Sequence, residues 1–124
     1  MKSVLVVDDE FGIADLLADV LGEEGYRVAT AASGRQALAQ MRAERPDVVL
    51  LDFMMPGLNG AGVLKAMAAA PELAGIPVAM MSSLGESTIG GLCDGYAAFL
   101  LKPFRLGDVI ETVARLANPA PKPT

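Results

Sequence analysis

Hydrophobic residues follow two alternating patterns along the chain. Short runs rich in Val, Leu and Ile are typical of strands that a parallel sheet buries on both faces. The strands predicted from these runs span 4–7, 27–31, 47–52, 78–82 and 97–101. The longer segments between them repeat apolar residues at helical spacing. The most regular of these stripes consists of Ile13, Leu16, Leu17, Val20 and Leu21. This alternation predicts an α/β domain of five strand-helix units with a parallel sheet.

Capping and breaker residues mark the ends of the expected helices. Gly25 follows the first stripe, where a glycine commonly ends a helix. Ser33, with Gln36 three residues later, resembles a capping box and predicts the start of the second helix. A third helix is expected from about 59 to 70, and the apolar stripe at 106–117 predicts the last. Only the helix between the fourth and fifth strands has no clear pattern.

Composition narrows the possible functions. The chain has 124 residues, which fits one domain, and 52% of them are hydrophobic, which is enough for a buried core. The net charge of -5 argues against direct nucleic-acid binding by this domain. The absence of histidine excludes histidine metal sites and histidine general bases. Cys93 is the only cysteine, so no internal disulfide can form, and its apolar setting favours a packing role.

The two ends of the chain carry no targeting signal that we recognise. Residues 1–3 lead into only four apolar residues, and no apolar run approaches the roughly 18 needed to cross a bilayer. We therefore expect a cytoplasmic protein with no membrane association. We expect one domain at 1–117. The proline-rich segment 118–124 cannot continue a helix, and it is interpreted as a C-terminal tail or the stub of a linker.

Polar residues stand where four of the five predicted strands end. The first strand ends in Asp8, Asp9 and Glu10, the third in Asp52, and the fourth in Ser82 and Ser83; the fifth ends in Lys102, which precedes Pro103. Ligands of open α/β sheets bind beyond the carboxyl ends of the strands. If these four strands are neighbours, three aspartates, a hydroxyl and an ammonium meet at one edge. Each alone has a simpler explanation, such as a helix cap or a solvated strand end.

Asp52 is open to three interpretations: a solvated strand end, a metal ligand or a nucleophile. Crowded carboxylates raise one another's pKa unless a cation joins them. Mg²⁺ suits such a site, because it accepts one or two carboxylates together with phosphate oxygens. The metal and Lys102 would then neutralise charge on a phosphoryl group that is transferred to Asp52. A site for metal alone is the weaker interpretation, since Lys102 would face the cation without an anion between them.

Four motifs carry a resemblance to a known family. The chain contains VLVVDDE, LLDFMMPGLNG, PVAMMSS and YAAFLLKPF, in that order. In order and spacing they closely resemble the receiver domain of two-component response regulators, over residues 2–117. The resemblance implies a flavodoxin-like, doubly wound parallel (βα)5 sheet with strand order 2-1-3-4-5. It also implies Mg²⁺-dependent transfer of a phosphoryl group to an aspartate. The donor would be the phosphohistidine of a sensor histidine kinase or a histidine phosphotransfer protein.

The resemblance assigns roles to the acidic residues. Asp52 matches the phosphoacceptor. Asp8 and Asp9 match the acidic pair that holds Mg²⁺ together with Asp52, and Met54 would give the ion its backbone carbonyl oxygen. The identity of the Met54 side chain is therefore unimportant for binding the metal.

The resemblance also assigns the residues that would bind the phosphoryl group and report its presence. Ser82 matches the switch hydroxyl, and the backbone amide of Ser83 would reach the same group. Lys102 would pair with a phosphoryl oxygen, and its bond to Pro103 resembles the family's cis peptide. Phe99 falls on the aromatic residue that turns inward when Ser82 moves. Phosphorylation would thereby alter the surface around the fourth helix, fifth strand and fifth helix.

One segment departs from the family pattern. Residues 84–95 form a stretch about two residues shorter than the resemblance leads us to expect, and Gly90 and Gly91 each disfavour a helix by roughly 1 kcal/mol relative to alanine. We expect a fourth helix that is short, shifted or mobile. The surface that the family usually uses for dimerisation on phosphorylation and for output would then differ here, and a distinctive partner interface is a hypothesis. The downstream partner is expected to be a protein.

Two apolar residues near the acceptor bear on the lifetime of the phosphoryl group. Met54 and Leu84 offer an attacking water no hydrogen bond, which predicts slow loss of the phosphoryl group.

Two other functions are alternatives to a phosphorylated signalling switch. An aspartate-nucleophile phosphohydrolase is one alternative, but it usually has a second acid where this chain has Met54. A receiver-like interaction module that is never phosphorylated is another, and the complete set of site residues argues against it. The preferred interpretation is a signalling switch rather than an enzyme.

Overall fold

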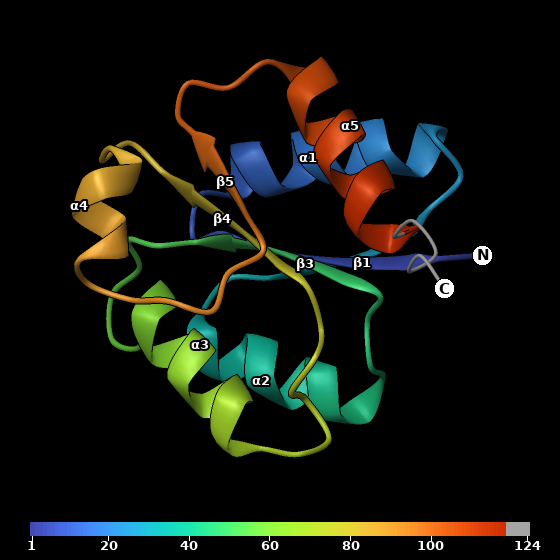
Figure 1. Ribbon diagram of the computed structural model, residues 1–124. Coiled ribbons are helices and arrows are strands. Elements are labelled where there is room, and N and C mark those ends of the chain that lie inside the picture. The colour runs from blue at the N-terminus through green and yellow to red at the C-terminus, as the bar shows by residue number, and fades with distance from the viewer. Residues whose placement is uncertain (119–124) are drawn as a thin grey trace, which may run out of the picture.

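A computed structural model describes residues 1–118 as five strands that alternate with five helices (Figure 1). The strands are β1 (Ser3–Val7), β2 (Arg27–Ala31), β3 (Val48–Asp52), β4 (Val78–Ser82) and β5 (Ala98–Leu101). The helices are α1 (Phe11–Glu23), α2 (Gly34–Ala43), α3 (Gly60–Ala69), α4 (Glu86–Gly90) and α5 (Leu106–Ala117). Every predicted strand is confirmed to within one residue at each end.

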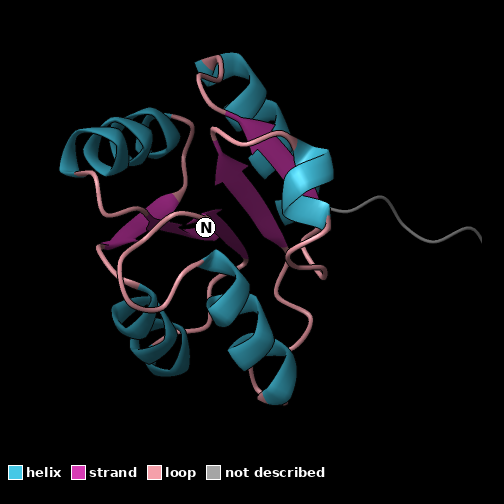
Figure 2. Cartoon of the chain, turned by 90° about the vertical axis from the view of Figure 1, so that its left-hand side faces the viewer, coloured by secondary structure: helices cyan, strands magenta, loops and turns pink. Residues whose placement is uncertain are grey.

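The five strands form one parallel sheet in the order β2-β1-β3-β4-β5. Helices α1 and α5 cover one face of the sheet, and α2 and α3 cover the other (Figure 1). The view in Figure 2 shows the strands as the middle layer between these helices. The flavodoxin-like, doubly wound architecture with strand order 2-1-3-4-5 is thus confirmed.

Alternate residues of the central strands enter two separate cores, because successive side chains of a strand point to opposite faces. The core beneath α2 and α3 includes Leu5, Val7, Val49, Leu51, Val78 and Met80. The core beneath α1 and α5 includes Val4, Val6, Val48, Leu50, Ala79 and Met81. Burial on both faces explains why these strands are apolar at consecutive positions.

Two helix ends follow the chemistry expected from the sequence. Gly25 adopts a φ of +96° just after α1, a conformation that favours glycine. The Ser33 side chain accepts a hydrogen bond from the Gln36 amide at 3.1 Å and caps α2. The Gln36 side chain returns a hydrogen bond by accepting from the Ala32 amide at 2.9 Å. The capping box is therefore confirmed, with its second bond shifted by one residue.

The predicted apolar stripes are too wide in two places. Leu16 and Leu106 are exposed, whereas the core side of α1 is formed by Ala14, Leu17 and Leu21. Leu16 lies at the margin of the helix face, because each residue turns a helix by about 100°. The inclusion of Leu16 in the apolar stripe was wrong for that reason.

Helix α4 has only five residues, which confirms the expected short helix. It lies apart from the other helices, at the end of the molecule toward which β4 runs (Figure 1). Its one buried residue is Ile89. The mobility of this segment stays a prediction.

In residues 1–118, none of the helices is both long enough and apolar enough to cross a membrane. Of the proposed tail at 118–124, all but Asn118 lies outside the described residues.

Candidate functional site

The carboxyl ends of β1, β3, β4 and β5 bring the predicted polar residues to one edge of the sheet. Asp8 directly follows β1, while Asp52 and Ser82 are the last residues of β3 and β4. Asp52 lies opposite Met81, so Ser82 stands one position further along the neighbouring strand. The backbone amide of Lys102 donates to the Ser82 carbonyl at 2.8 Å. Parallel pairing therefore assembles residues that are far apart in the sequence.

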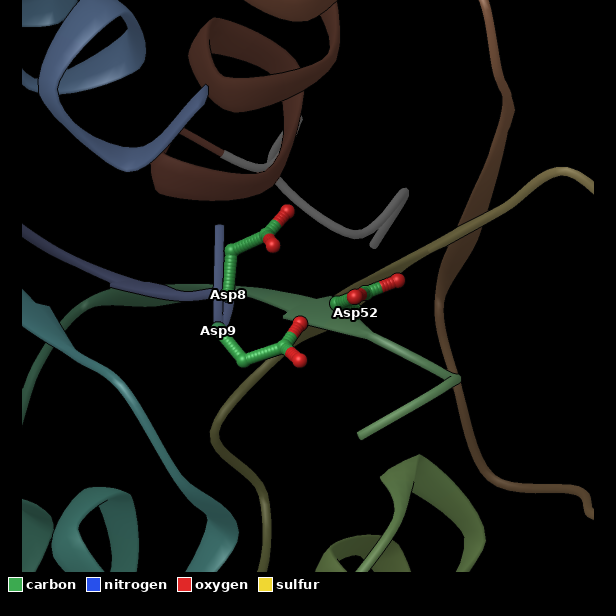
Figure 3. Close-up of side chains that lie close together, drawn as sticks. All are labelled: Asp8, Asp9 and Asp52. Atoms are coloured by element: carbon green, nitrogen blue, oxygen red, sulfur yellow. The ribbon is translucent and has the colours of Figure 1, made fainter. Parts of the chain in front are cut away.

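Three carboxylates converge in this place. Figure 3 shows the side chains of Asp8, Asp9 and Asp52 reaching toward a common space from the ends of β1 and β3. A carboxylate oxygen of each lies within 4.8 Å of those of the other two. Asp8 and Asp52 are only 2% and 4% exposed, whereas Asp9 is exposed. Two buried acids and one open to solvent thus share one small volume.

Lys102 joins the two buried carboxylates. Its ammonium group donates to Asp8 Oδ2 at 3.2 Å and to Asp52 Oδ1 at 3.3 Å. The other Asp8 oxygen accepts from the Glu10 amide at 2.9 Å, which fixes the orientation of this carboxylate. Within residues 1–118, every buried side-chain polar atom has a hydrogen-bond partner. The site is therefore held in place before any ligand binds.

The charges in the site oppose one another. Burial raises the pKa of Asp52 from its ordinary 3.8 to about 6, and repulsion from Asp8 adds to this, while Lys102 acts in the opposite direction. Burial lowers the pKa of Lys102, but the attraction of Asp52 and Asp8 outweighs this and raises it. Burial is thus the largest cause of the raised pKa of Asp52, and the attraction of Lys102 does not cancel it.

The donor set suits a hard divalent cation. Carboxylate oxygens from Asp8, Asp9 and Asp52 lie close enough to bind one ion together. Oxygen ligands of this kind are preferred by Mg²⁺, which keeps several of its waters. The exposed position of Asp9 leaves that side of the site open to solvent. The residues present therefore fit the predicted magnesium site.

The other residues predicted to belong to the site differ in their burial and hydrogen bonds. Ser82 is buried, and its hydroxyl accepts from the Leu84 amide at 2.9 Å, while Ser83 is exposed. The Lys102-Pro103 peptide bond is cis, as the resemblance implied. Phe99 is half-buried in β5, with its ring centroid 6.2 Å from that of Tyr96.

The side chain of Met54 is exposed beside the site, in the loop that connects β3 to α3. The role of its backbone carbonyl as a metal ligand stays a prediction.

Comparison with protein families agrees with this geometry. Residues 4–114 match the model of the response regulator receiver domain. The chain belongs to this family. It is accordingly a signalling module rather than a classical enzyme. The receiver also has the acidic pocket and lysine that the four sequence motifs predicted.

Characterised relatives and solved structures extend the comparison. The receiver is 37% identical to the DNA-binding response regulator MtrA of Mycobacterium tuberculosis over 93% of its length, but covers only 50% of that protein. It is 38% identical to the probable transcriptional regulatory protein TcrX of the same organism, of which it covers 46%. The chain therefore spans about half the length of the curated relatives it matches.

Among solved structures, the Vibrio cholerae chemotaxis protein CheY4 is 33% identical to the receiver, with a TM-score of 0.85. The match covers 94% of this chain and 98% of that one. A Francisella response regulator receiver domain has the same identity and TM-score, with 94% and 97% covered.

One residue near the site escaped the sequence analysis. Gly60 begins α3, and its backbone lies against the end of β3. A glycine directly after the helix-capping Asn59 was the available signal, because glycine disfavours helices and needs a reason to be there.

Proposed function

We propose that this receiver accepts a phosphoryl group on Asp52 from the phosphohistidine of a sensor histidine kinase or a histidine phosphotransfer protein. The observation that carries the proposal is the contact of Lys102 with Asp8 and Asp52 at the carboxyl ends of the strands. A buried acid with a raised pKa beside a fixed ammonium is an arrangement that stability alone does not favour.

The reaction needs Asp52 as a carboxylate. One of its oxygens attacks phosphorus while the bond from phosphorus to the histidine nitrogen breaks. The electron pair stays on the imidazole, whose other nitrogen carries the proton that keeps the ring neutral. The product on this chain is an acyl phosphate at Asp52.

Asp8, Asp9, Asp52 and the Met54 carbonyl are the groups that would hold Mg²⁺, which supplies neutralisation of charge on the transferring oxygens. Lys102 would turn from the carboxylates to a phosphoryl oxygen and place its positive charge where negative charge develops. The Ser83 amide would donate to the same group.

The signal would pass through Ser82 and Phe99. Phosphorylation adds about two negative charges and strong hydrogen-bond acceptors. The Ser82 hydroxyl would then exchange the Leu84 amide for a phosphoryl oxygen, and Phe99 would move inward. A shift between the two packings would change the surface formed by α4, β5 and α5.

The partners follow from the same proposal. The relatives include DNA-binding regulators, but the receiver corresponds to only about half of each. We propose that this domain acts in the cytoplasm through a downstream protein, without direct contact to nucleic acid or membrane. Phosphorylation allows dimerisation, for which the short α4 offers a surface unlike that of receivers with a longer helix.

The decisive experiment is to incubate the protein with acetyl phosphate and Mg²⁺ and to measure its intact mass. We expect one added phosphoryl group on the wild type and on Asp15→Asn, which changes an exposed aspartate of α1. The Asp52→Asn variant should remain unlabelled. Absence of label on the wild type, under conditions that label another receiver, would overturn the proposal.

The lifetime of the phosphoryl group supplies a second test. Met54 is exposed and gives an attacking water no hydrogen-bond partner. We therefore expect slow hydrolysis, and we expect Met54→Gln to shorten the half-life about fivefold, the effect of about one hydrogen bond. The half-life is measured by intact mass after removal of the phosphodonor. A wild-type half-life of seconds would contradict this expectation.

A further inference from the structure

The first residue of α3 lies against the backbone that carries Asp52. A Cβ placed on Gly60 would be 2.8 Å from the Phe53 Cα, 3.1 Å from the Asp52 carbonyl oxygen and 3.0 Å from the Met80 sulfur. Two of these three atoms belong to the backbone of the site itself. A side chain at position 60 would therefore have to displace either α3 or the end of β3.

The same contact is closed by a hydrogen bond. The Gly60 amide donates to the Phe53 carbonyl at 2.9 Å, across the loop that carries Met54. The start of the helix is fixed in turn, because the Asn59 side chain accepts from the Gly62 amide at 3.0 Å. The loop between β3 and α3 is thus tied at Gly60, immediately beside Asp52 and Met54.

We propose that Gly60 is a positioning residue, which sets the path of the 52–54 backbone and with it the place of the Asp52 carboxylate and the Met54 carbonyl. The inference rests on the proposed function, in which these two groups bind Mg²⁺. Gly60 touches neither the metal nor the phosphoryl group. It acts by letting α3 approach closely enough to hold both ligands.

A neighbouring glycine separates this role from simple helix packing. A Cβ placed on Gly62 would meet the end of the Leu58 side chain, at Cδ1 and Cγ. The end of a leucine side chain can rotate away, whereas the backbone at positions 52 and 53 cannot. Both glycines lie in the first turn of α3, so alanine removes the same unfavourable helix propensity at each. The two substitutions differ chiefly in what the new methyl group meets.

The experiment titrates wild type, Gly60→Ala and Gly62→Ala with Mg²⁺ and follows the backbone amide NMR signals of residues 52–54. We expect the dissociation constant for Mg²⁺ to rise about tenfold or more for Gly60→Ala, as is typical when a group that orients a metal ligand is changed. For Gly62→Ala we expect less than a twofold change. Urea unfolding establishes that each variant is folded. A folded Gly60→Ala that binds Mg²⁺ within twofold of wild type would overturn the inference.

A second measurement uses the wild type alone, so it tests the role of Gly60 even if Gly60→Ala does not fold. If the Gly60 contact helps to bind Mg²⁺, then Mg²⁺ must in turn stabilise that contact. Hydrogen exchange of the Gly60 amide should slow at least threefold in saturating Mg²⁺, while exchange of the Ala37 amide in α2 should not change. Unchanged exchange at Gly60 contradicts the inference. Failure of the wild type to bind any Mg²⁺ instead refutes the metal site of the proposed function.

Discussion

This receiver has two groups of opposite charges, one exposed and one buried. The distances between their charged atoms do not indicate how much the protein depends on each. Arg27 and Glu44 approach to 2.7 Å, with side chains that are 61% and 65% exposed. Lys102 lies 3.2 Å from Asp8 and 3.3 Å from Asp52, and its side chain is 17% exposed. The shorter contact is on the surface, where water and salt weaken it. Burial therefore decides how much the chain depends on each contact.

The buried group also contains a charge that is energetically unfavourable, whereas the exposed pair does not. Exposed ion pairs contribute roughly 0–1 kcal/mol, and their loss changes little. The cluster around Lys102 leaves the Asp52 pKa near 6, so one carboxylate is unfavourable in its ionised form. Buried charges of this kind are often replaced by apolar residues without loss of stability. Their arrangement at the strand ends is consistent with a site kept for its chemistry.

The largest effect is expected from Lys102→Met, which removes the ammonium that joins the two buried acids. Repulsion between Asp8 and Asp52 is then uncompensated, and the pKa of Asp52 should rise above 6. Because the charge that faces the phosphoryl group is also lost, labelling by acetyl phosphate should slow about 100-fold or more. The initial labelling rate at pH 7, measured by intact mass, checks this.

The matched control for this prediction is Lys65→Met, because Lys65 is an exposed lysine on α3. Its labelling rate should equal that of the wild type. Equal labelling rates for Lys102→Met and wild type would contradict the prediction, because the buried ammonium would then contribute no more to phosphorylation than a surface lysine does.

A smaller effect is expected on stability, from Asp52→Asn in the absence of metal. The pKa of Asp52 is raised from 3.8 to about 6 in the fold, so the folded protein binds this proton more tightly than the unfolded chain does. The resulting stability is full below about pH 3.8 and is lost as the pH rises through about 6. The asparagine variant cannot ionise, so at pH 8 it should be more stable than the wild type by on the order of 3 kcal/mol.

Urea unfolding at several pH values tests this prediction. The difference between the two proteins should nearly disappear at pH 4, where Asp52 is mostly protonated. Adding Mg²⁺ at pH 8 should stabilise the wild type more than the variant. Equal free energies of unfolding at pH 8 without metal would show that ionised Asp52 costs the fold no more than an ionised surface carboxylate.

The sequence predicted most of the fold because its signals are local. Val48 to Asp52 is apolar at consecutive positions up to the final acid, as a strand buried on both faces requires. The strand-end positions of Asp8, Asp52, Ser82 and Lys102 then followed from the general place of ligand sites in such sheets. The resemblance to receivers supplied the strand order.

Other features depend on distances that no local pattern contains. The contact of Lys102 with both Asp8 and Asp52 joins residues that are 94 and 50 positions apart. The close approach of Gly60 to Phe53 depends on how α3 packs against β3. These features are set by tertiary packing.

The smallest effect is expected from the surface pair of Arg27 and Glu44. A double-mutant cycle with Arg27→Ala and Glu44→Ala should give a coupling free energy below about 1 kcal/mol, although the two atoms are only 2.7 Å apart. The coupling should fall further in 1 M NaCl, where the Debye length is about 3 Å. Labelling by acetyl phosphate should be unchanged in all three variants. A coupling free energy above 2 kcal/mol would contradict this prediction, because an exposed pair would then be as strong as a buried one. Distance rather than burial would then set the strength of ion pairs in this receiver.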